Sequence, residues 1–435
     1  MRLRRRVPAL LAGAALVAAI AALPATNGFA TTTQAAAAAC SAPQWAEGVN
    51  YPAGSRVTYT SRTYQALVTH TPPAGAGWNP AGTPALWTDL GPCDGNPSPP
   101  PTVPPTPTPT PTVPPGSTSC PVKSKPAGKV LQGYWENWDG AANGVHPPLG
   151  WIPITDSRIR THGYNVINAA FPVIRPDGTV LWEDGMDATV KVATPAEMCQ
   201  AKAAGLTILM SIGGATAGID LSSSVVADRF VATIVPILKR YNFDGIDIDI
   251  ETGLTGSGNI NQLSTSQANL IRIIDGVLAQ MPANFGLTMA PETAYVTGGS
   301  VVYGSIWGAY LPIVKRYADN GRLWWLNMQY YNGSMYGCAG DSYPAGTVEG
   351  FTKQTDCLNT GLVVQGTTIR VPYDKQVPGL PAQPGAGGGH LAPGAVAQAW
   401  NTYGGALKGL MTWSLNWDGS KGWTFGDNVR TLQGR

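Results

Sequence analysis

The residues of this chain whose types and spacing could do chemistry lie in one octapeptide, 244–251, which reads DGIDIDIE. Side chains alternate between the two faces of a strand, so Asp247, Asp249 and Glu251 would share one face and isoleucines the other. Burying neighbouring carboxylates is costly unless protons are shared, so at least one carboxyl group should stay protonated near neutral pH. A protonated carboxyl group can act as a general acid. The octapeptide therefore predicts acid catalysis, while Asp244, on the opposite face, should hold the start of the strand.

Two other interpretations of the octapeptide are a solvent-facing strand and a cation site. The first conflicts with the isoleucines of the opposite face and with the lack of a balancing Lys or Arg. The second would need about six to eight oxygen ligands around a sphere, whereas a straight strand places its carboxylates along a line. The cysteine spacings and the scattered histidines also offer no zinc pattern. We expect neither a metal nor another cofactor.

The elements that must position these acids follow from the rest of the chain, which alternates short apolar runs with helical patterns after residue 124. The expected strands are 130–135, 165–171, 206–212, 245–251, 286–290, 323–331, 376–381 and 409–414, and the expected helices include 195–204, 222–241, 266–279 and 395–402. This alternation predicts an α/β fold, a parallel (β/α)8 TIM barrel. Glu251 would then lie at the carboxyl end of a strand, where barrel active sites form.

The octapeptide resembles the DxxDxDxE signature of glycoside hydrolase family 18, and the match is complete. Further segments resemble bacterial, secreted chitinases of that family in order and strand position: Gly133–Trp135, Asn168–Phe171, Ser211–Gly214, Met289–Glu292, Met328–Asn332 and Met411–Ser414. The resemblance covers the whole of residues 124–435. It implies hydrolysis of β-1,4-linked N-acetylglucosamine polymer by a retaining mechanism, in which the 2-acetamido oxygen of the substrate attacks the anomeric carbon.

The resemblance also implies roles for the acids and for one tyrosine. Glu251 would protonate the leaving oxygen and later deprotonate water. Asp249 would orient the acetamide and stabilise the oxazolinium intermediate, and Asp247 would share a proton with Asp249. Many members read Met-x-Tyr-Asp on the sixth strand, where this chain has two tyrosines followed by Asn332. We align Tyr331, because a polar residue follows it, and expect it to hydrogen-bond the acetamide oxygen.

The remaining expected substrate contacts come from five strands. Gln329 shares strand parity with Tyr331, and together with Asn332 it would complete a polar wall. Trp413 would form the floor of the subsite in which the sugar is distorted. For three further residues, contact with the ligand and packing inside the barrel are equally compatible with the pattern: Tyr134, Phe171 and Met289.

The block 40–93 is short and rich in aromatic residues, more than so small a core can hide. It resembles the chitin-binding modules of families 5 and 12 through Trp45, Tyr51–Gly54, Val57–Tyr59, Tyr64–Ala66, His70–Thr71, Gly77–Pro80 and Pro84–Trp87. The resemblance implies a compact β module that adheres to chitin. Exposed flat rings stack on sugar faces, and we expect Trp78, Trp87 and Tyr64 to contribute them.

Composition sets the boundaries of the domains. Residues 1–30 combine an arginine-rich start with a short apolar run, as in a secretory signal peptide, and cleavage could fall as late as residue 39. Residues 94–119 are almost entirely Pro, Thr, Ser and Gly, which indicates an extended linker between the module at 40–93 and the catalytic domain at 124–435. We therefore expect a secreted, extracellular protein.

The charge and the six cysteines fit that compartment. Subtracting the four arginines that precede Cys40 from the formal charge of +2 leaves −2, so no basic excess exists to hold a nucleic acid. No later apolar run is long enough for a membrane helix. In an oxidising compartment, disulfides would join Cys40 to Cys93 and Cys338 to Cys357, while Cys120 and Cys199 could be paired or free.

The expected partners are chitin and N-acetylglucosamine oligosaccharides, bound by a monomer. The connections of the barrel leave little sequence for an inserted domain that would wall the cleft, which favours internal, endo-type cutting. Two alternatives use the same site: an endo-β-N-acetylglucosaminidase acting on N-glycans, and a non-catalytic chitin lectin. A chitin-adhering module argues against the first, and the presence of Glu251 argues against the second.

Overall fold

The computed structural model describes residues 38–72, 79–94, 117–142, 144–146 and 149–435. The predicted signal peptide, most of the predicted linker and Trp78 lie outside the described residues. The chain divides into two compact units, within residues 1–109 and 110–435. In the described part of the chain, no helix is both long enough and apolar enough to cross a membrane.

The first unit contains a four-stranded sheet in the order β1-β4-β3-β2. Its strands are β1 (Ala38–Ala39), β2 (Arg56–Tyr59), β3 (Arg62–Ala66) and β4 (Trp87–Asp94). Tyr51, Val57, Tyr64, Ala66 and Trp87 form its core. The predicted disulfide between Cys40 and Cys93 is present and ties the first and last strands together. A closing disulfide is physically sensible here, because so few apolar side chains are buried.

The second unit is built on an eight-stranded parallel sheet, in the order β12-β11-β10-β9-β6-β5-β18-β17. The strands are β5 (Val130–Glu136), β6 (Val166–Ala170), β9 (Thr207–Gly213), β10 (Gly245–Asp249), β11 (Gly286–Met289), β12 (Trp325–Leu326), β17 (Gly379–Pro381) and β18 (Gly409–Trp413). Parallel bridges from Leu326 to Gln376 and from Gln329 to Gly379 join the two end strands, so the sheet closes. The predicted (β/α)8 barrel is confirmed.

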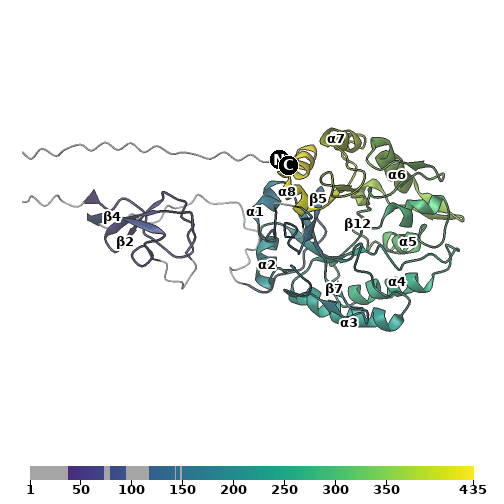
Figure 1. Ribbon diagram of the computed structural model, residues 1–435, viewed down its shortest axis with the longest axis horizontal. Helices are drawn as coiled ribbons and strands as arrows, with labels where there is room; N and C mark the ends of the chain where they lie inside the picture. Colours follow the sequence, from purple (N-terminus) through teal and green to yellow (C-terminus); the bar gives the residue numbers. More distant parts are fainter. Residues whose placement is uncertain (1–37, 73–78, 95–116, 143, 147–148) are drawn as a thin grey trace, which may run out of the picture. The chain divides into compact units, whose positions relative to one another are not determined.

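Helices surround the strands (Figure 1). They are α1 (Ser157–Thr161), α2 (Pro195–Ala203), α3 (Ser224–Arg240), α4 (Thr265–Leu278), α5 (Leu311–Asp319), α6 (Val348–Thr360), α7 (Pro393–Asn401), α8 (Leu415–Ser420) and α9 (Thr424–Leu432). Local sequence fixes several starts: Thr194 with Glu197, and Ser264 with Gln267, form capping boxes at α2 and α4. The apolar faces of these helices pack on the outside of the barrel in one large core.

Short elements complete the barrel unit. Three antiparallel pairs are formed by β7 (Val173–Ile174) with β8 (Val180–Leu181), β13 (Met335–Tyr336) with β14 (Ser342–Tyr343), and β15 (Leu362–Val364) with β16 (Thr367–Ile369). Three 3-10 turns span Thr293–Tyr295, Thr297–Ser300 and Tyr373–Lys375. The disulfide predicted between Cys338 and Cys357 ties the segment after β13 to α6.

Two of the predicted strands are much shorter than expected. The run 323–331 contains β12 at Trp325–Leu326 only, and 376–381 contains β17 at Gly379–Pro381 only. Beyond these bounds the ladder continues as isolated bridges at Gln329 and Gln376. Pro378 interrupts regular pairing before β17, because proline has no N–H to donate.

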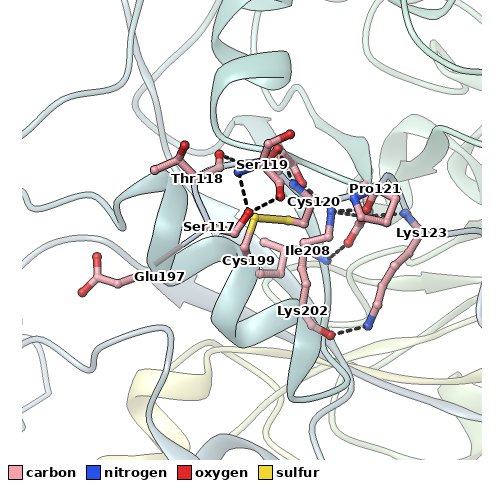
Figure 2. Close-up of a disulfide and its surroundings, with 12 residues drawn as sticks. Ser117, Thr118, Ser119, Cys120, Pro121, Lys123, Glu197, Cys199, Lys202 and Ile208 are labelled. Atoms are coloured by element: carbon pink, nitrogen blue, oxygen red, sulfur yellow. Dashed lines mark hydrogen bonds and ion pairs between the residues drawn. A yellow bond between two sulfur atoms is a disulfide. The ribbon is translucent and has the colours of Figure 1, made fainter. Parts of the chain in front are cut away.

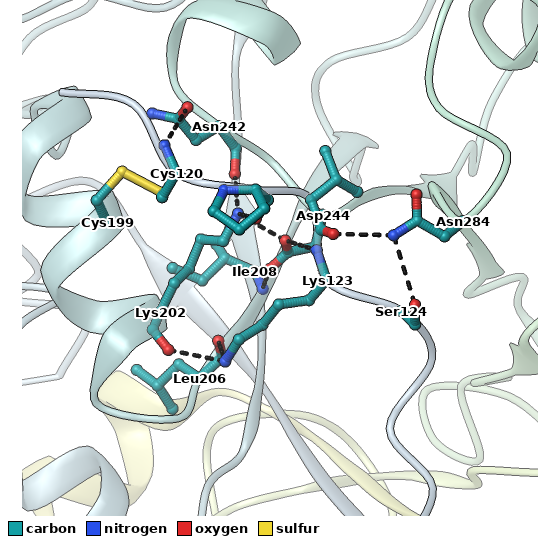
Figure 3. A network of polar contacts seen from close by, with 12 residues as sticks. Cys120, Lys123, Ser124, Cys199, Lys202, Leu206, Ile208, Asn242, Asp244 and Asn284 are labelled. Atoms are coloured by element: carbon teal, nitrogen blue, oxygen red, sulfur yellow. Dashed lines mark hydrogen bonds and ion pairs between the residues drawn. A yellow bond between two sulfur atoms is a disulfide. The ribbon is translucent and has the colours of Figure 1, made fainter. Parts of the chain in front are cut away.

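The amino-terminal end of the barrel holds the segment 117–124, which includes the last residues of the predicted linker. Cys120 and Cys199, whose state the sequence left open, form a disulfide that attaches this segment to α2 (Figure 2). The Cys120 N–H also donates to Asn242 Oδ1 at 3.2 Å. The Lys123 ammonium group donates to the carbonyl oxygens of Lys202 and Leu206 at 2.7 and 2.8 Å (Figure 3).

Asp244 lies in this network, far from the pocket described below. One of its oxygens accepts from the Lys123 N–H at 2.7 Å and pairs with the Lys202 ammonium group at 2.7 Å (Figure 3). The other accepts from the Ile208 N–H at 2.9 Å. Asp244 therefore holds the start of β10 against β9, as its parity in the octapeptide predicts.

Candidate active site

The three same-face acids of the octapeptide lie along β10 and its extension. Asp247 is fully buried, Asp249 is 3% exposed, and Glu251 lies two residues beyond the end of the strand. Ile246, Ile248 and Ile250 face the helices and are fully buried. The backbones of β9 and β10 lie very close together at this end of the barrel. An added Cβ on Gly213 would lie 2.2 Å from the Asp249 carbonyl oxygen. Gly213 also has φ +109, so glycine is the residue that fits.

Asp247 is held by side chains from four other parts of the barrel. The Tyr134 and Ser211 hydroxyls donate to one oxygen at 2.6 and 2.8 Å. The Thr288 hydroxyl and the Asn327 amide donate to the other at 2.5 and 3.0 Å. Burial raises the pKa of Asp247, and these hydrogen bonds oppose the rise. Within the described residues its polar contacts are with these four donors rather than with Asp249, with which it was expected to share a proton.

Asp249 and Glu251 are joined through one amide group. Gln329 Nε2 donates to Asp249 Oδ1 at 2.9 Å and to Glu251 Oε1 at 3.0 Å, and lies 3.1 Å from the Ala290 carbonyl oxygen. Burial and the charges of Glu251 and Asp247 raise the pKa of Asp249 well above its usual value. The close like charges favour a state in which one of the two carboxyl groups is protonated, while the shared amide donor opposes the rise in pKa.

The pKa of Glu251 is also raised. Burial is the main cause and the charge of Glu292 adds to it, while hydrogen bonds with Gln329 and Asp249 oppose the rise. Glu251 can therefore stay protonated at a higher pH than an ordinary glutamate. This is the property that a general acid needs.

A pocket of about 170 Å³ opens above these acids. Seven predicted site residues line it: Phe171, Asp249, Glu251, Gln329, Tyr331, Asn332 and Trp413. The other lining residues are Gly214, Ala215 and Ala386. The Phe171 and Trp413 rings lie nearly parallel, with centroids 6.0 Å apart and an interplanar angle of 17°. The pocket therefore combines a carboxyl pair with a flat aromatic wall.

Burial raises the pKa of Tyr331 well above its usual value, and the charges of Asp249 and Glu251 add to the rise. Its hydroxyl group therefore keeps its proton at any pH at which the protein works. A buried hydroxyl at the pocket wall is a hydrogen-bond donor to a ligand oxygen.

Two expected ligand contacts lie outside this pocket. Met289 pairs in register with Ile248, so its side chain faces the helices, and the expectation that it contacts the ligand is wrong. Tyr134 does not line the pocket either; its hydroxyl donates to Asp247 and its ring lies 5.4 Å from that of Trp413. Tyr134 thus supports the residues of the site from below.

Several residues around the acids were given no role in the prediction from sequence. Ser211 and Thr288 sit opposite Asp247 in the sheet register, so strand pairing would have indicated them. Tyr310 and Tyr295 hold the backbone near Glu251: the Tyr310 hydroxyl accepts from the Ile250 N–H at 2.9 Å, and the Tyr295 hydroxyl donates to the Glu251 carbonyl at 2.6 Å. No local pattern points to these two tyrosines, because they approach from the loops after β11.

In the module, two of the three expected chitin contacts are buried. Trp87 and Tyr64 are 2% and 4% exposed and belong to the core, so they offer no free ring face, and that expectation is wrong. The third, Trp78, lies outside the described residues. Trp45 and Tyr59 are only partly buried and pack edge to face, with centroids 5.4 Å apart. Trp87 cannot stack on a sugar because its ring packs against the rings of Tyr51 and His70.

Known proteins resemble both units. Residues 130–295 match the model of the glycosyl hydrolases family 18, and residues 44–88 match that of the carbohydrate-binding module family 5/12. The chain is 82% identical over 312 residues to Endochitinase 4 of Metarhizium robertsii, covering 72% of this chain and 90% of that protein. It is 82% identical over 311 residues to Endochitinase 37 of Trichoderma harzianum, covering 72% and 92%.

A solved structure is similar over both units. The family GH18 chitinase from Chromobacterium violaceum superposes with a TM-score of 0.60 at 28% identity, covering 91% of this chain and all of that one. The two endochitinases named above come from fungi, whereas the sequence pattern suggested bacterial relatives.

Proposed function

Because the chain belongs to the glycosyl hydrolases family 18, it is a chitin-hydrolysing enzyme, and we propose that it cuts chitin internally with Glu251 as acid and base. The observation that carries this proposal is the pair of carboxyl groups, Asp249 and Glu251, bridged by Gln329 at one wall of the pocket. The chitin-hydrolysing function agrees with relatives named endochitinases.

In the first step Glu251 gives its proton to the glycosidic oxygen as the bond from that oxygen to the anomeric carbon breaks. The 2-acetamido oxygen of the same sugar bonds to the anomeric carbon from the other side and forms an oxazolinium ion. The raised pKa of Glu251 supports this role, because the proton must be present at the working pH. No protein nucleophile is required.

Asp249 and Tyr331 act on the acetamide group in this proposal. Tyr331, which keeps its proton, donates a hydrogen bond to the acetamide oxygen. Asp249 accepts from the acetamide nitrogen and stabilises its positive charge as the ring closes. Asp247, tied by four donors, acts through its charge, which raises the pKa of Asp249. This charge effect replaces the shared proton that the family resemblance implied.

In the second step water attacks the anomeric carbon and transfers a proton to Glu251. The bond from the anomeric carbon to the acetamide oxygen breaks, the acetamide is restored, and the configuration is retained after two inversions. Trp413 and Phe171 form the flat wall against which the sugar lies during both steps. Stacking on aromatic faces suits the apolar face of a pyranose ring.

Chitin is the binding partner of both units, through the pocket and through the module of family 5/12. We propose that the protein acts outside the cell, which agrees with the three disulfides that use all six cysteines. We also propose that it acts as a monomer. The domain limits 40–93, 94–119 and 124–435 and the signal peptide 1–30 remain part of the proposal.

The test is the Glu251→Gln variant, assayed with chitin hexamer. We expect kcat to fall by about 10²- to 10⁴-fold while adhesion to chitin particles stays unchanged. The control is Glu183→Gln, which changes an exposed glutamate. For the native chain, the first product resolved by NMR should be the β anomer. Unchanged hydrolysis in Glu251→Gln, or α-anomer as first product, would contradict the mechanism.

A further inference from the structure

Asn332 follows Tyr331 and has an unusual backbone conformation. Its φ is +62, in the left-handed region that asparagine tolerates better than most residues. Its N–H donates to the Gly388 carbonyl oxygen at 2.9 Å, and its side-chain Oδ1 accepts from the Gly388 N–H at 2.7 Å. One residue at the pocket wall is thus tied twice to one residue of a distant loop.

That loop is the glycine-rich segment 385–389, which connects β17 to α7. Its backbone packs directly against the end of the sixth strand: an added Cβ on Gly387 would lie 3.1 Å from the Tyr331 ring. On the other side, an added Cβ on Gly389 would lie 2.4 Å from Ala345 Cβ. Ala386, in the middle of the segment, is 7% exposed and lines the pocket beside Tyr331.

A segment this rich in glycine loses much conformational freedom when it is ordered, so ordering needs compensating contacts. With no side chain, Gly387, Gly388 and Gly389 contribute only backbone groups. The two hydrogen bonds with Asn332 tie the middle of the segment to the residue next to Tyr331. Because these three glycines have no side chains, side-chain packing cannot take the place of the two hydrogen bonds.

We propose that Asn332 is a positioning residue that clamps the segment 385–389 onto Tyr331 and so fixes the tyrosine hydroxyl for the acetamide group. The proposal rests on the proposed function, because it assumes the role of Tyr331. It differs from the substrate contact expected for Asn332 from sequence, because Oδ1 is already occupied by Gly388. The clamp thereby also holds Ala386, the residue of this segment that lines the pocket.

Three variants separate the clamp from other roles. Asn332→Gly keeps the left-handed backbone and removes Oδ1, while Asn332→Asp keeps an oxygen acceptor and also tolerates the left-handed region. Asn242→Gly is the matched control: it removes another asparagine with positive φ, at the amino-terminal end of the barrel, where its side chain binds Cys120. All three are made in the full chain.

The measurements are hydrogen–deuterium exchange of peptides covering 382–392, and kcat and KM with chitin hexamer. In Asn332→Gly we expect faster exchange of the Gly388 amide and a loss of kcat of about two- to tenfold, the range for one hydrogen bond. KM should change less, because the tyrosine is misplaced for ring closure. Asn332→Asp should restore exchange protection and most of kcat, and Asn242→Gly should change neither quantity.

Several outcomes would overturn the clamp. They are unchanged exchange in Asn332→Gly, faster exchange without loss of kcat, and failure of Asn332→Asp to restore protection. A loss of kcat with unchanged exchange would instead place Asn332 on the substrate. Because exchange is measured without substrate, this result stands whether or not Glu251 proves to be the acid, so failure of the clamp and failure of the proposed function remain distinguishable.

Discussion

Replacing Asp244 by asparagine should destabilise the barrel without impairing the chemistry, although Asp244 belongs to the same octapeptide as the acids. Its two oxygens accept from two backbone N–H groups and pair with the Lys202 ammonium group. Lys202 is 3% exposed and Asp244 is fully buried. An asparagine would turn an N–H group toward one of these donors and leave the lysine charge without its partner.

The size of the effect follows from that burial. Breaking a buried ion pair by removing one partner costs about 3–5 kcal/mol. For a domain of this size each kcal/mol lowers Tm by about 2 °C, so Asp244→Asn should lower it by about 6–10 °C. Glu251 lies seven residues along the strand, about 20 Å away. At that distance a local change at the amino-terminal end leaves the pocket intact.

The assay pairs thermal unfolding at pH 7 with steady-state kinetics on chitin hexamer at 25 °C. Asp249→Asn is the matched control, since it makes the same substitution on the same strand. It should lower kcat strongly, because asparagine lacks the negative charge that would stabilise the oxazolinium ion. It should not lower Tm, because burial and the charges of Glu251 and Asp247 make an ionised Asp249 costly in the folded chain. An unchanged Tm in Asp244→Asn, or a kcat/KM reduced more than about tenfold, would refute the reasoning. Asp244 would then not be a purely structural member of the octapeptide.

Two further predictions concern pH. Glu292→Gln should move the basic limb of the kcat/KM profile toward lower pH, because the charge of Glu292 adds to burial in raising the pKa of Glu251. An unmoved limb would show that Glu292 does not affect the pKa of Glu251. His146 is buried and hydrogen-bonds Glu136 at 2.6 Å. Burial lowers the pKa of His146, but the hydrogen bond and charge of Glu136 and the backbone hydrogen bonds together outweigh burial, so the pKa is raised. Stability from this pair is full below about pH 6.5 and is lost as pH rises through the raised value, so His146→Gln should be less stable by about 1.5–3 kcal/mol at low pH and by less at high pH. Denaturant unfolding at pH 5 and pH 9 tests this, and a constant difference would contradict it.

The sequence allowed the barrel and the acids to be predicted because both depend on local patterns. Parity alone separates Asp247, Asp249 and Glu251 from the isoleucines, and the structure keeps that separation along β10. Parity also puts Asp244 on the other face, where it meets Lys202. In each case the two-residue repeat of a strand carries the information.

The rest of the site depends on register and on loops, which local patterns do not carry. Thr288 reaches Asp247 because of the way β10 pairs with β11, and the same pairing turns Met289 away from the pocket. Reading strands one at a time finds aromatic and apolar candidates but cannot say which face they take. The single-residue shift between Thr288 and Met289 decides whether a side chain meets a carboxylate or a helix.

The position of the glycine segment 385–389 also could not be predicted from local patterns. Its composition indicates a loose surface loop, because nothing in it can pack as a side chain. In the structure the missing side chains let the backbone of this segment lie close to Tyr331. Asn332 supplies a polar side-chain contact to that backbone. A glycine run beside a catalytic strand can therefore form a wall of a pocket when one left-handed asparagine is placed to hold it.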